Sequence, residues 1–382
     1  MKENLKFKNG KFKMMLVGDP HEKAADETER EQAIIRDYLR LQNAALDAIR
    51  PDLVIFMGDN AGGNTPEELR KSIERIVAPV KERNIPLAVV FGNHDLEKKM
   101  GAQKEHIDIY NEYENCRFTN ASPFVSEDGD YNLFIYDEEN KNPLYNLWFL
   151  YSGNRAPKEY HSKYAFVKDE QIVWYEDACK KIAEQNGGKV LPALLFQHIP
   201  VPEEYRLLKE TTPLSMLFDG VVGLNGKKGK YFALDRKNTD VEGYMGEAPC
   251  TPDYNNGQFD SWKKMGDVKG AFFGHDHLND FVGTVDGIVL GQCKLSGFRQ
   301  YGDGLMQGVR VVELDTSDLS KFHTYMRYYR ELVGTDCDSI QGSLKWLRDR
   351  QSVKLETSLK ALGVAAAVAA PFVLAKALRR KK

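Results

Sequence analysis

Apolar runs alternate with segments of helical periodicity along the first quarter of the chain. The three runs are Phe12–Val17, Leu53–Met57 and Leu87–Phe91. Leu53–Met57 is uninterrupted, which is typical of a parallel strand that is buried on both faces. Between the runs, apolar residues recur at helical spacing over 28–49 and 66–83. Thr65 suits the N-cap of the second helix, which Pro79 should kink or shorten. Strands that alternate with helices in this way predict an α/β fold with a parallel sheet.

The pattern continues less regularly through the rest of the chain. Asn132–Tyr136 and Leu147–Tyr151 predict a hairpin, and 169–185 predicts a helix. Further strands are predicted at Leu191–Phe196, Val268–Phe273, 287–293 and 308–314. The segment 202–264 is polar and rich in glycine and proline, so we expect loops over a functional site there.

Composition places the chain among ordinary soluble globular proteins. Hydrophobic residues make up 42% of the 382 residues, which is enough for a sizeable core. The net charge is -3 and no basic block precedes the last few residues, so no nucleic-acid surface is expected. Five scattered cysteines and the lack of an apolar leader predict reduced thiols, no secretory signal and a cytoplasmic location.

The C-terminal segment differs from the rest, and we place a boundary between a main domain at 1–335 and a helical tail at 336–382. Residues 361–375 are apolar, and basic residues follow at 376 and 379–382. Fifteen helical residues reach about 22 Å, short of the roughly 30 Å hydrocarbon core of a bilayer. Two interpretations therefore stay open: weak membrane association through this segment, or a packing or oligomerisation helix.

Polar residues concentrate where the predicted strands end. They are Asp19, His21, Asp59, Asn93, His94, Asp95, His198, His275 and His277. Each cluster alone is compatible with an ordinary turn or a buried histidine. In a parallel sheet, however, ligands bind beyond the carboxyl ends of the strands, so their repetition there indicates one site. His275 and His277 would face the same side of an extended chain, and Gly274 would allow close backbone approach.

This mixture of imidazole, carboxylate and amide groups suits metal ions. Imidazole and carboxylate favour Mn, Fe or Zn, and the lack of thiolates argues against a structural zinc site. With this many ligands we expect two divalent metal ions, about 3.5–4 Å apart, that share one carboxylate.

The ordered motifs resemble those of the calcineurin-like metallophosphoesterases, and most closely those of the branch related to purple acid phosphatases. The motifs are Asp19-x-His21, Gly58-Asp59, Gly92-Asn93-His94-Asp95, His198 and Gly274-His275-x-His277. The resemblance extends over roughly residues 11–314. It implies a two-sheet β-sandwich flanked by helices, with the site at the strand ends. It also implies that 1–335 is the catalytic domain.

The resemblance implies a distribution of ligands between two metals. One would be held by Asp19, His21, Asp59 and His277, and the second by Asp59, Asn93, His198 and His275. His94 would protonate the leaving oxygen or hold the phosphate, and Asp95 would orient it. True purple acid phosphatases carry a tyrosine where this chain has Gly62 and a glycine where it has His21. A purple iron–tyrosinate centre is therefore not expected.

The function implied is hydrolysis of phosphoric esters by a hydroxide that bridges two metals. Monoesters are favoured, with a phosphorylated small molecule or a phosphoprotein as substrate. Weaker candidates for contacting the phosphate are Asn154, Arg155 and Arg299, each of which could instead be an ordinary solvated loop residue. Two alternatives stay open: a phosphodiesterase for cyclic nucleotides or nucleic acid, and a catalytically inactive metal-binding scaffold.

Overall fold

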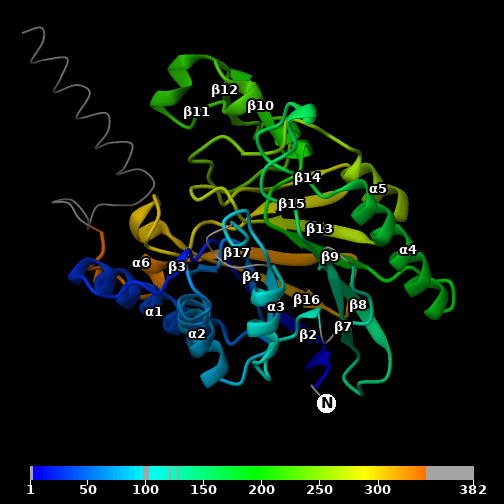
Figure 1. Ribbon diagram of the computed structural model, residues 1–382. Helices are drawn as coiled ribbons and strands as arrows, with labels where there is room; N and C mark the ends of the chain where they lie inside the picture. Colours follow the sequence, from blue (N-terminus) through cyan, green and yellow to red (C-terminus); the bar gives the residue numbers. More distant parts are fainter. Residues whose placement is uncertain (1–2, 98–102, 120–121, 127–128, 341–382) are drawn as a thin grey trace, which may run out of the picture.

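The computed structural model describes residues 3–97, 103–119, 122–126 and 129–340. Two β-sheets pack face to face, and helices lie on both outer sides (Figure 1). This is the α/β two-sheet sandwich that the resemblance implied. The predicted tail helix and its apolar segment lie outside the described residues.

The smaller of the two main sheets supplies the first three strand ends of interest. Its order is β17-β16-β2-β4-β6. The bounds are Phe322–Tyr328 (β17), Gly308–Asp315 (β16), Lys11–Val17 (β2), Leu53–Met57 (β4) and Leu87–Val90 (β6). The pairs β2–β4 and β4–β6 are parallel, while β16 runs antiparallel to both β2 and β17. The carboxyl ends of the parallel strands β2, β4 and β6 therefore lie at the same edge of the sheet.

Helices α1 (Glu29–Ile49) and α2 (Pro66–Glu82) bury one face each in the same hydrophobic core as this sheet. The Thr65 side chain accepts a hydrogen bond from the backbone of Glu68, so the predicted cap is present. The helix continues for three residues beyond Pro79. A short helix, α3 (Gln103–Asn111), lies beside α2.

The larger sheet has seven strands in the order β1-β7-β8-β9-β13-β15-β14. Their bounds are Leu5–Lys6 (β1), Tyr131–Tyr136 (β7), Pro143–Leu150 (β8), Ala193–Gln197 (β9), Val268–Phe273 (β13), Ile288–Gln292 (β15) and Val282–Val285 (β14). The predicted hairpin is β7–β8, and β8, β9, β13 and β15 run parallel. Helices α4 (Asp169–Gln185) and α5 (Gln258–Met265) cover the outer face of this sheet.

Alternation along β9 shows how the larger sheet divides two cores. Leu194 and Phe196 face the core shared with the five-stranded sheet, whereas Leu195 faces α4 and α5. The ring of Phe196 lies between those of Phe149 and Phe272, with centroid distances of 5.3 and 6.0 Å. This row of rings ties three neighbouring strands together just below the ends of β9 and β13.

The prediction of loops over 202–264 was wrong. Besides α5, this segment forms a small antiparallel sheet in the order β10-β12-β11. Its elements are η3 (Pro202–Leu207), β10 (Leu208–Thr211), η4 (Pro213–Leu217), β11 (Val221–Val222), η5 (Asn225–Lys227) and β12 (Tyr231–Leu234). Strands this short, with one face in water, leave no apolar run for a pattern to detect.

A few short elements complete the fold. They are β3 (Glu22–Lys23), β5 (Ala61–Gly62), η2 (Lys158–Tyr160), η6 (Gly304–Met306) and α6 (Tyr329–Leu332). The buried Asp37 carboxylate on α1 accepts the backbone N–H groups of Asp338 and Ser339, at 2.8 and 2.6 Å. The last described residues, just past the predicted boundary, are thereby tied to α1.

All five cysteines are buried free thiols, as expected from their spacing. Within the described ranges, no helix combines the length and the apolar character that crossing a bilayer requires.

Truncation of Phe196 should test the shared core. Its side chain is fully buried, so Phe196→Ala should lower the free energy of unfolding by about 3–5 kcal/mol through lost contacts and an unfilled cavity. Urea denaturation would measure this. Val173→Ala, at an exposed position on α4, is the control and should change stability by about 0.5 kcal/mol or less. Equal effects of the two variants would contradict the packing described.

Candidate metal centre

The polar residues predicted from the strand ends meet at one edge of the sandwich. Asp19 and Asp59 follow β2 and β4, and the pair Asn93 and His94 follows β6. His198 follows β9, and His275 and His277 follow β13. Both sheets therefore contribute, and the side chains come together where the edges of the two sheets converge.

The groups form two adjacent clusters, each of which could hold a metal ion. Asp19, His21 and His277 make the first, and Asp59, His198 and His275 make the second. In the first, the Nε2 atoms of His21 and His277 lie 3.2 Å apart, and a carboxylate oxygen of Asp19 lies 3.7 Å from His277 Nε2. The two imidazoles therefore point their ring nitrogens at one place.

Asp59 stands between the two clusters. One oxygen of its carboxylate lies 3.3 Å from His198 Nε2 in the second cluster and 3.6 Å from His21 Nε2 in the first. The Asn93 side-chain oxygen lies 3.2 Å from His198 Nε2, which places Asn93 with the second cluster. Asp59 is therefore the carboxylate that lies beside both clusters.

The backbone adopts the left-handed conformation at four of these positions. Asp19, His21, Asp59 and His275 all have positive φ angles, of 49°, 48°, 51° and 73°. Residues other than glycine rarely adopt this conformation, and each instance costs about 1–3 kcal/mol. A side chain at Gly92 would collide with the backbone nitrogen and carboxylate of Asp59, so only glycine allows the β6 end to approach this closely.

The left-handed conformation of His275 corrects one expectation from the sequence. The chain is not extended through Asp276; β13 ends at Phe273, and the His275 backbone N–H donates to the Asp19 carboxylate. His275 and His277 are consequently turned toward different clusters. Simple alternation along a strand predicted one shared side but not this division.

Burial determines the direction of the pKa shift of three of the four histidines in the two clusters. Burial lowers the pKa of His21 to about 3, although the Asp59 charge opposes the shift. Burial also lowers the pKa of His277 to about 4, and that of His275 falls well below its usual value for the same reason. These three imidazoles are therefore neutral at pH 7, which is the form that binds metals.

His198 behaves differently because two carboxylates face it. Burial alone would lower its pKa, but Asp59 and then Asp19 raise it to about 10. Burial would likewise raise the pKa of Asp59, but the His198 charge outweighs this and the pKa falls below its usual range. A positive charge at this point is thus what the two buried carboxylates require.

The residues fit a pair of metal ions on two further grounds. The Asp19 and Asp59 carboxylates are 0% and 3% exposed, and the residues paired with them in the described structure are histidines rather than lysine or arginine. Buried carboxylates need compensating cations. In addition, the Nε2 atom of His275 is buried and has no hydrogen-bond partner within the described residues. A ring nitrogen in that situation has its lone pair available to a cation.

The far sides of two histidines are held by backbone carbonyls. His198 Nδ1 donates to the Met57 carbonyl at 2.9 Å, and His277 Nδ1 donates to the Tyr301 carbonyl at 3.0 Å. Each bond orients the ring so that Nε2 faces the site. The Tyr301 ring also stacks on His277, with centroids 4.4 Å apart.

Glu247 completes this support and was missed from the sequence. Its carboxylate accepts hydrogen bonds from the Tyr301 hydroxyl at 2.8 Å and from the Leu278 backbone at 2.9 Å. Glu247 therefore clamps Tyr301 and the residue after His277 together. Nothing in the local pattern around 247 or 301 marks these residues, because only the fold brings them to His277. Across the site, the Tyr164 ring lies edge-on to His275 at 4.4 Å, and it was missed for the same reason.

The structure gives Asp95 a different partner from the one expected. Its buried carboxylate accepts backbone N–H groups from Gly92, Asn60 and Ala61 and so fastens the β4 and β6 ends together. Burial, reinforced by the Asp59 charge, raises its pKa to about 7. The half-exposed His94 ring instead pairs through Nδ1 with Glu97, at 3.1 Å. His94 also donates its backbone N–H to Asp59 at 2.7 Å, which keeps it beside the clusters.

The weaker candidates for phosphate contact differ in their exposure and in their partners. Arg155, next to Asn154, is exposed, and its backbone pairs with Tyr164, whose ring touches His275. Arg299 is buried, and its guanidinium pairs with Glu31 and lies 3.6 Å from Glu22. Its charge is thus engaged by two carboxylates, which argues against the phosphate role suggested for it.

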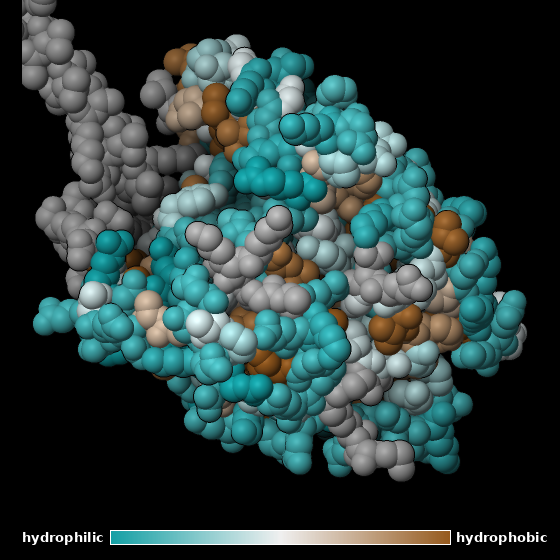
Figure 2. Space-filling view, viewed as in Figure 1, coloured by the Kyte–Doolittle hydropathy of each residue, from teal (hydrophilic) through white to brown (hydrophobic). Residues whose placement is uncertain are grey.

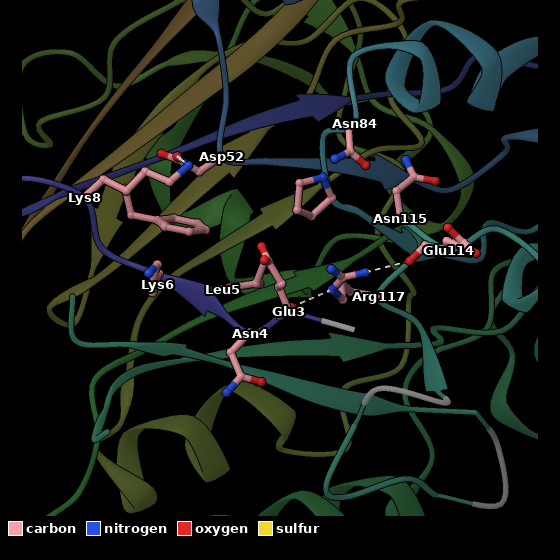
Figure 3. Close-up of a pocket in the computed structure, with 12 residues that line it drawn as sticks. Glu3, Asn4, Leu5, Lys6, Lys8, Asp52, Asn84, Glu114, Asn115 and Arg117 are labelled. Carbon is pink, nitrogen blue, oxygen red and sulfur yellow. Dashed lines mark hydrogen bonds and ion pairs between the residues drawn. The ribbon is translucent and has the colours of Figure 1, made fainter. Parts of the chain in front are cut away.

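A separate pocket lies at the opposite edge of the smaller sheet. Its lining includes Asp52 and Pro86, which directly precede β4 and β6, so it opens at the amino ends of these strands. Arg117 projects into it and donates to the carbonyls of Glu3 and Glu114 (Figure 3). Lys8 pairs with Asp52 at this pocket, which contains none of the predicted site residues.

A two-sheet sandwich with two metal-binding clusters at its strand ends defines the class of metallophosphoesterases. Residues 12–279 match the family described as calcineurin-like phosphoesterase, and the chain belongs to this family. It is similar to two relatives from Arabidopsis thaliana named probable inactive purple acid phosphatases 29 and 14. The first is 28% identical over 82% of this chain and 79% of its own length, and the second is 29% identical over 80% and 75%.

Two further proteins extend the comparison. A phosphatase from Saccharomyces cerevisiae named DCR2 is 26% identical over 83% of this chain and 54% of its own length. The crystal structure of a dimetal phosphatase from Danio rerio superposes with a TM-score of 0.50 at 10% identity, covering 83% of this chain and 96% of that one. At that identity the structural likeness shows the fold alone.

Removing the Glu247 clamp should weaken the first cluster. In Glu247→Ala, Tyr301 and the His277 loop lose their common anchor, so affinity for Mn²⁺ should fall about 10–100-fold at one of two sites. Isothermal titration of metal-stripped protein would measure it. Glu139→Ala, at an exposed turn, is the matched control. Unchanged affinity in Glu247→Ala would show that the clamp does not support the cluster.

Proposed function

We propose that this protein is a metal-dependent phosphoric ester hydrolase with a dinuclear metal centre, and that it acts on phosphomonoesters. The single observation that carries the proposal is the pair of adjacent clusters with Asp59 between them, 3.3 Å from His198 and 3.6 Å from His21. A carboxylate common to two sets of ligands is the arrangement that two-metal phosphate chemistry uses.

We propose the two ligand sets that the resemblance implies. Asp19, His21, Asp59 and His277 would hold one metal, and Asp59, Asn93, His198 and His275 would hold the other. The bound ions would neutralise phosphoryl oxygens and lower the pKa of a water molecule toward neutrality. Their identity is Mn, Fe or Zn on the preference of imidazole and carboxylate ligands.

His94 would supply the proton that the leaving oxygen needs. Its ring lies 5.5 Å from that of His21 and is half exposed, so it borders both the cluster and the solvent from which a substrate enters. Glu97 holds Nδ1, which leaves Nε2 to face a substrate oxygen. A positioned imidazole of this kind contributes about 10²–10⁴-fold to a hydrolysis rate.

The alternative of an inactive scaffold has one specific observation in its favour, which is that the two relatives from Arabidopsis thaliana carry the word inactive in their names. Against it, this chain retains every member of both clusters and His94 beside them. The substrate we propose is a phosphorylated small molecule or a phosphoprotein. A diesterase for cyclic nucleotides or nucleic acid is the remaining alternative within enzymes.

His94→Ala should separate chemistry from metal binding. The ring contributes no ligand to either cluster, so metal content should be unchanged, while turnover should fall by about 10² or more. Elemental analysis would measure the metal content, and hydrolysis of p-nitrophenyl phosphate would measure the turnover. His323→Ala, at an exposed position on β17, is the control and should behave as wild type. Normal turnover in purified His94→Ala would exclude the proposed role.

Asp59→Asn should abolish the binding of both metal ions. The amide removes the negative charge that faces both clusters, and so neither set of ligands would be complete. Elemental analysis should find less than one metal per chain, with activity lost in proportion. Asp260→Asn, at an exposed position on α5, should retain wild-type metal content. Loss of only one metal from Asp59→Asn would contradict a shared ligand.

Metal replacement distinguishes the three candidate functions. Metal-stripped protein, refilled in turn with Mn, Fe, Zn or Mg, would be assayed on p-nitrophenyl phosphate and on its bis ester. We expect hydrolysis of the monoester with at least one of the first three ions. Faster hydrolysis of the bis ester would favour a phosphodiesterase. Stoichiometric metal binding without hydrolysis of either ester would favour the scaffold.

A further inference from the structure

The small sheet built from β10, β11 and β12 carries an exposed apolar surface. We call residues 208–234 the lobe. Of the nine large hydrophobic side chains exposed within the described ranges, four lie in its residues 214–222. They are Leu214 (66% exposed), Met216 (47%), Phe218 (68%) and Val222 (40%). Figure 2 shows hydrophobic atoms gathered where Figure 1 labels β11.

The exposure follows from the way the lobe is built. Helix η4 packs against β11 and β12, so one side of η4 is covered by the sheet. On β11, Val221 is buried against the lobe and its neighbour Val222 faces outward by strand alternation. The apolar side chains on the outward side are therefore exposed to solvent. Clustered apolar exposure of this kind marks a contact surface for a protein or a membrane.

The lobe also carries an excess of basic residues. The lobe contains four lysines against two acidic residues, whereas the whole chain has a net charge of -3. Lys209 and Lys228 are exposed, and Lys227 lies over the Tyr205 ring at 4.1 Å. Lys230 pairs with Glu210, which accounts for one of the two acids. Exposed apolar side chains and lysines in one lobe complement a surface that has an apolar interior and anionic headgroups.

The chain beyond the described residues has the same composition. After Ile340 it continues for 42 residues, in which apolar 361–375 is followed by Lys376 and by Arg379, Arg380, Lys381 and Lys382. A second apolar segment with adjacent basic residues strengthens the case for a lipid partner, because membrane attachment usually takes two weak signals.

We propose that the lobe docks on an anionic lipid surface, with Leu214, Met216, Phe218 and Val222 entering the headgroup boundary and the lysines contacting lipid phosphates. The lobe lies between β9 and β13 in the chain, and both strands deliver histidines to the metal centre. Docking would therefore hold the catalytic edge at a defined place relative to the membrane. This inference does not depend on hydrolytic activity.

Co-sedimentation of the full-length protein with vesicles tests the proposal. Wild type should bind vesicles of mixed phosphatidylcholine and phosphatidylserine, and high salt should weaken the binding. Leu214→Ser combined with Phe218→Ser should reduce partitioning about tenfold or more, because two apolar side chains no longer leave water. Lys209→Glu combined with Lys228→Glu should reduce it about fivefold or more per lysine.

Matched controls use exposed residues of the same type elsewhere. Val173→Ser with Val190→Ser controls for lost surface hydrophobicity, and Lys104→Glu with Lys141→Glu controls for charge. Both should bind as wild type. Unaltered metal content in the lobe variants would show that the fold is intact, since none of these residues touches the clusters.

Three outcomes would overturn the proposal. The first is wild-type protein that does not sediment with anionic vesicles. The second is equal binding by wild type and both lobe variants, which would assign membrane binding to the C-terminal segment alone. The third is self-association of wild type without vesicles, measured by sedimentation velocity, that is lost in Leu214→Ser with Phe218→Ser. That result would make the surface a contact between copies of the chain.

Discussion

The burial of two carboxylates at the junction of two sheets is the constraint on which the rest of this structure depends. Asp19 and Asp59 follow the strands β2 and β4, and almost no water reaches either side chain. Such charges are stable only when cations or hydrogen-bond donors surround them. Four histidines gather around them for this reason: His21 lies two residues from Asp19, and His198, His275 and His277 follow the strands β9 and β13. One of the four, His198, carries a raised pKa. The fold thus concentrates negative charge where two metal ions would be held.

Positioning that charge requires local strain that a purely structural edge would not need. Four of the cluster residues have left-handed backbone conformations, at about 1–3 kcal/mol each. The offsetting interactions lie close by: Asp95 binds three backbone N–H groups across the β4 and β6 ends, and Asp19 accepts the His275 N–H. A site that retains such strain together with a buried lone pair on His275 is organised to bind something. The strain and the available lone pair therefore favour a site that binds metal ions over a set of side chains that binds nothing.

The parts of the structure that were predictable are those in which the signal is local. The apolar runs located β4 and β13 at their observed bounds, and Thr65 marked the start of α2. The motifs also indicated which side chains would meet, because parallel strands present their carboxyl ends at one edge. The lobe was missed, since its strands are two to four residues long. The turn at His275 was missed as well, because a strand pattern does not record where the backbone turns left-handed.

The supporting residues show a deeper limit and suggest how the site could vary within its family. Tyr301 and Glu247 reach His277 from segments far apart in the sequence, and neither sits in a motif. The metal-binding residues follow the ends of the central strands, whereas Glu247 lies in the connection that contains the lobe. A change in that connection can therefore alter how firmly His277 is held without altering any ligand. Proteins of this family with complete motifs could thus differ in metal affinity and activity, and completeness of the motifs alone would not reveal the difference.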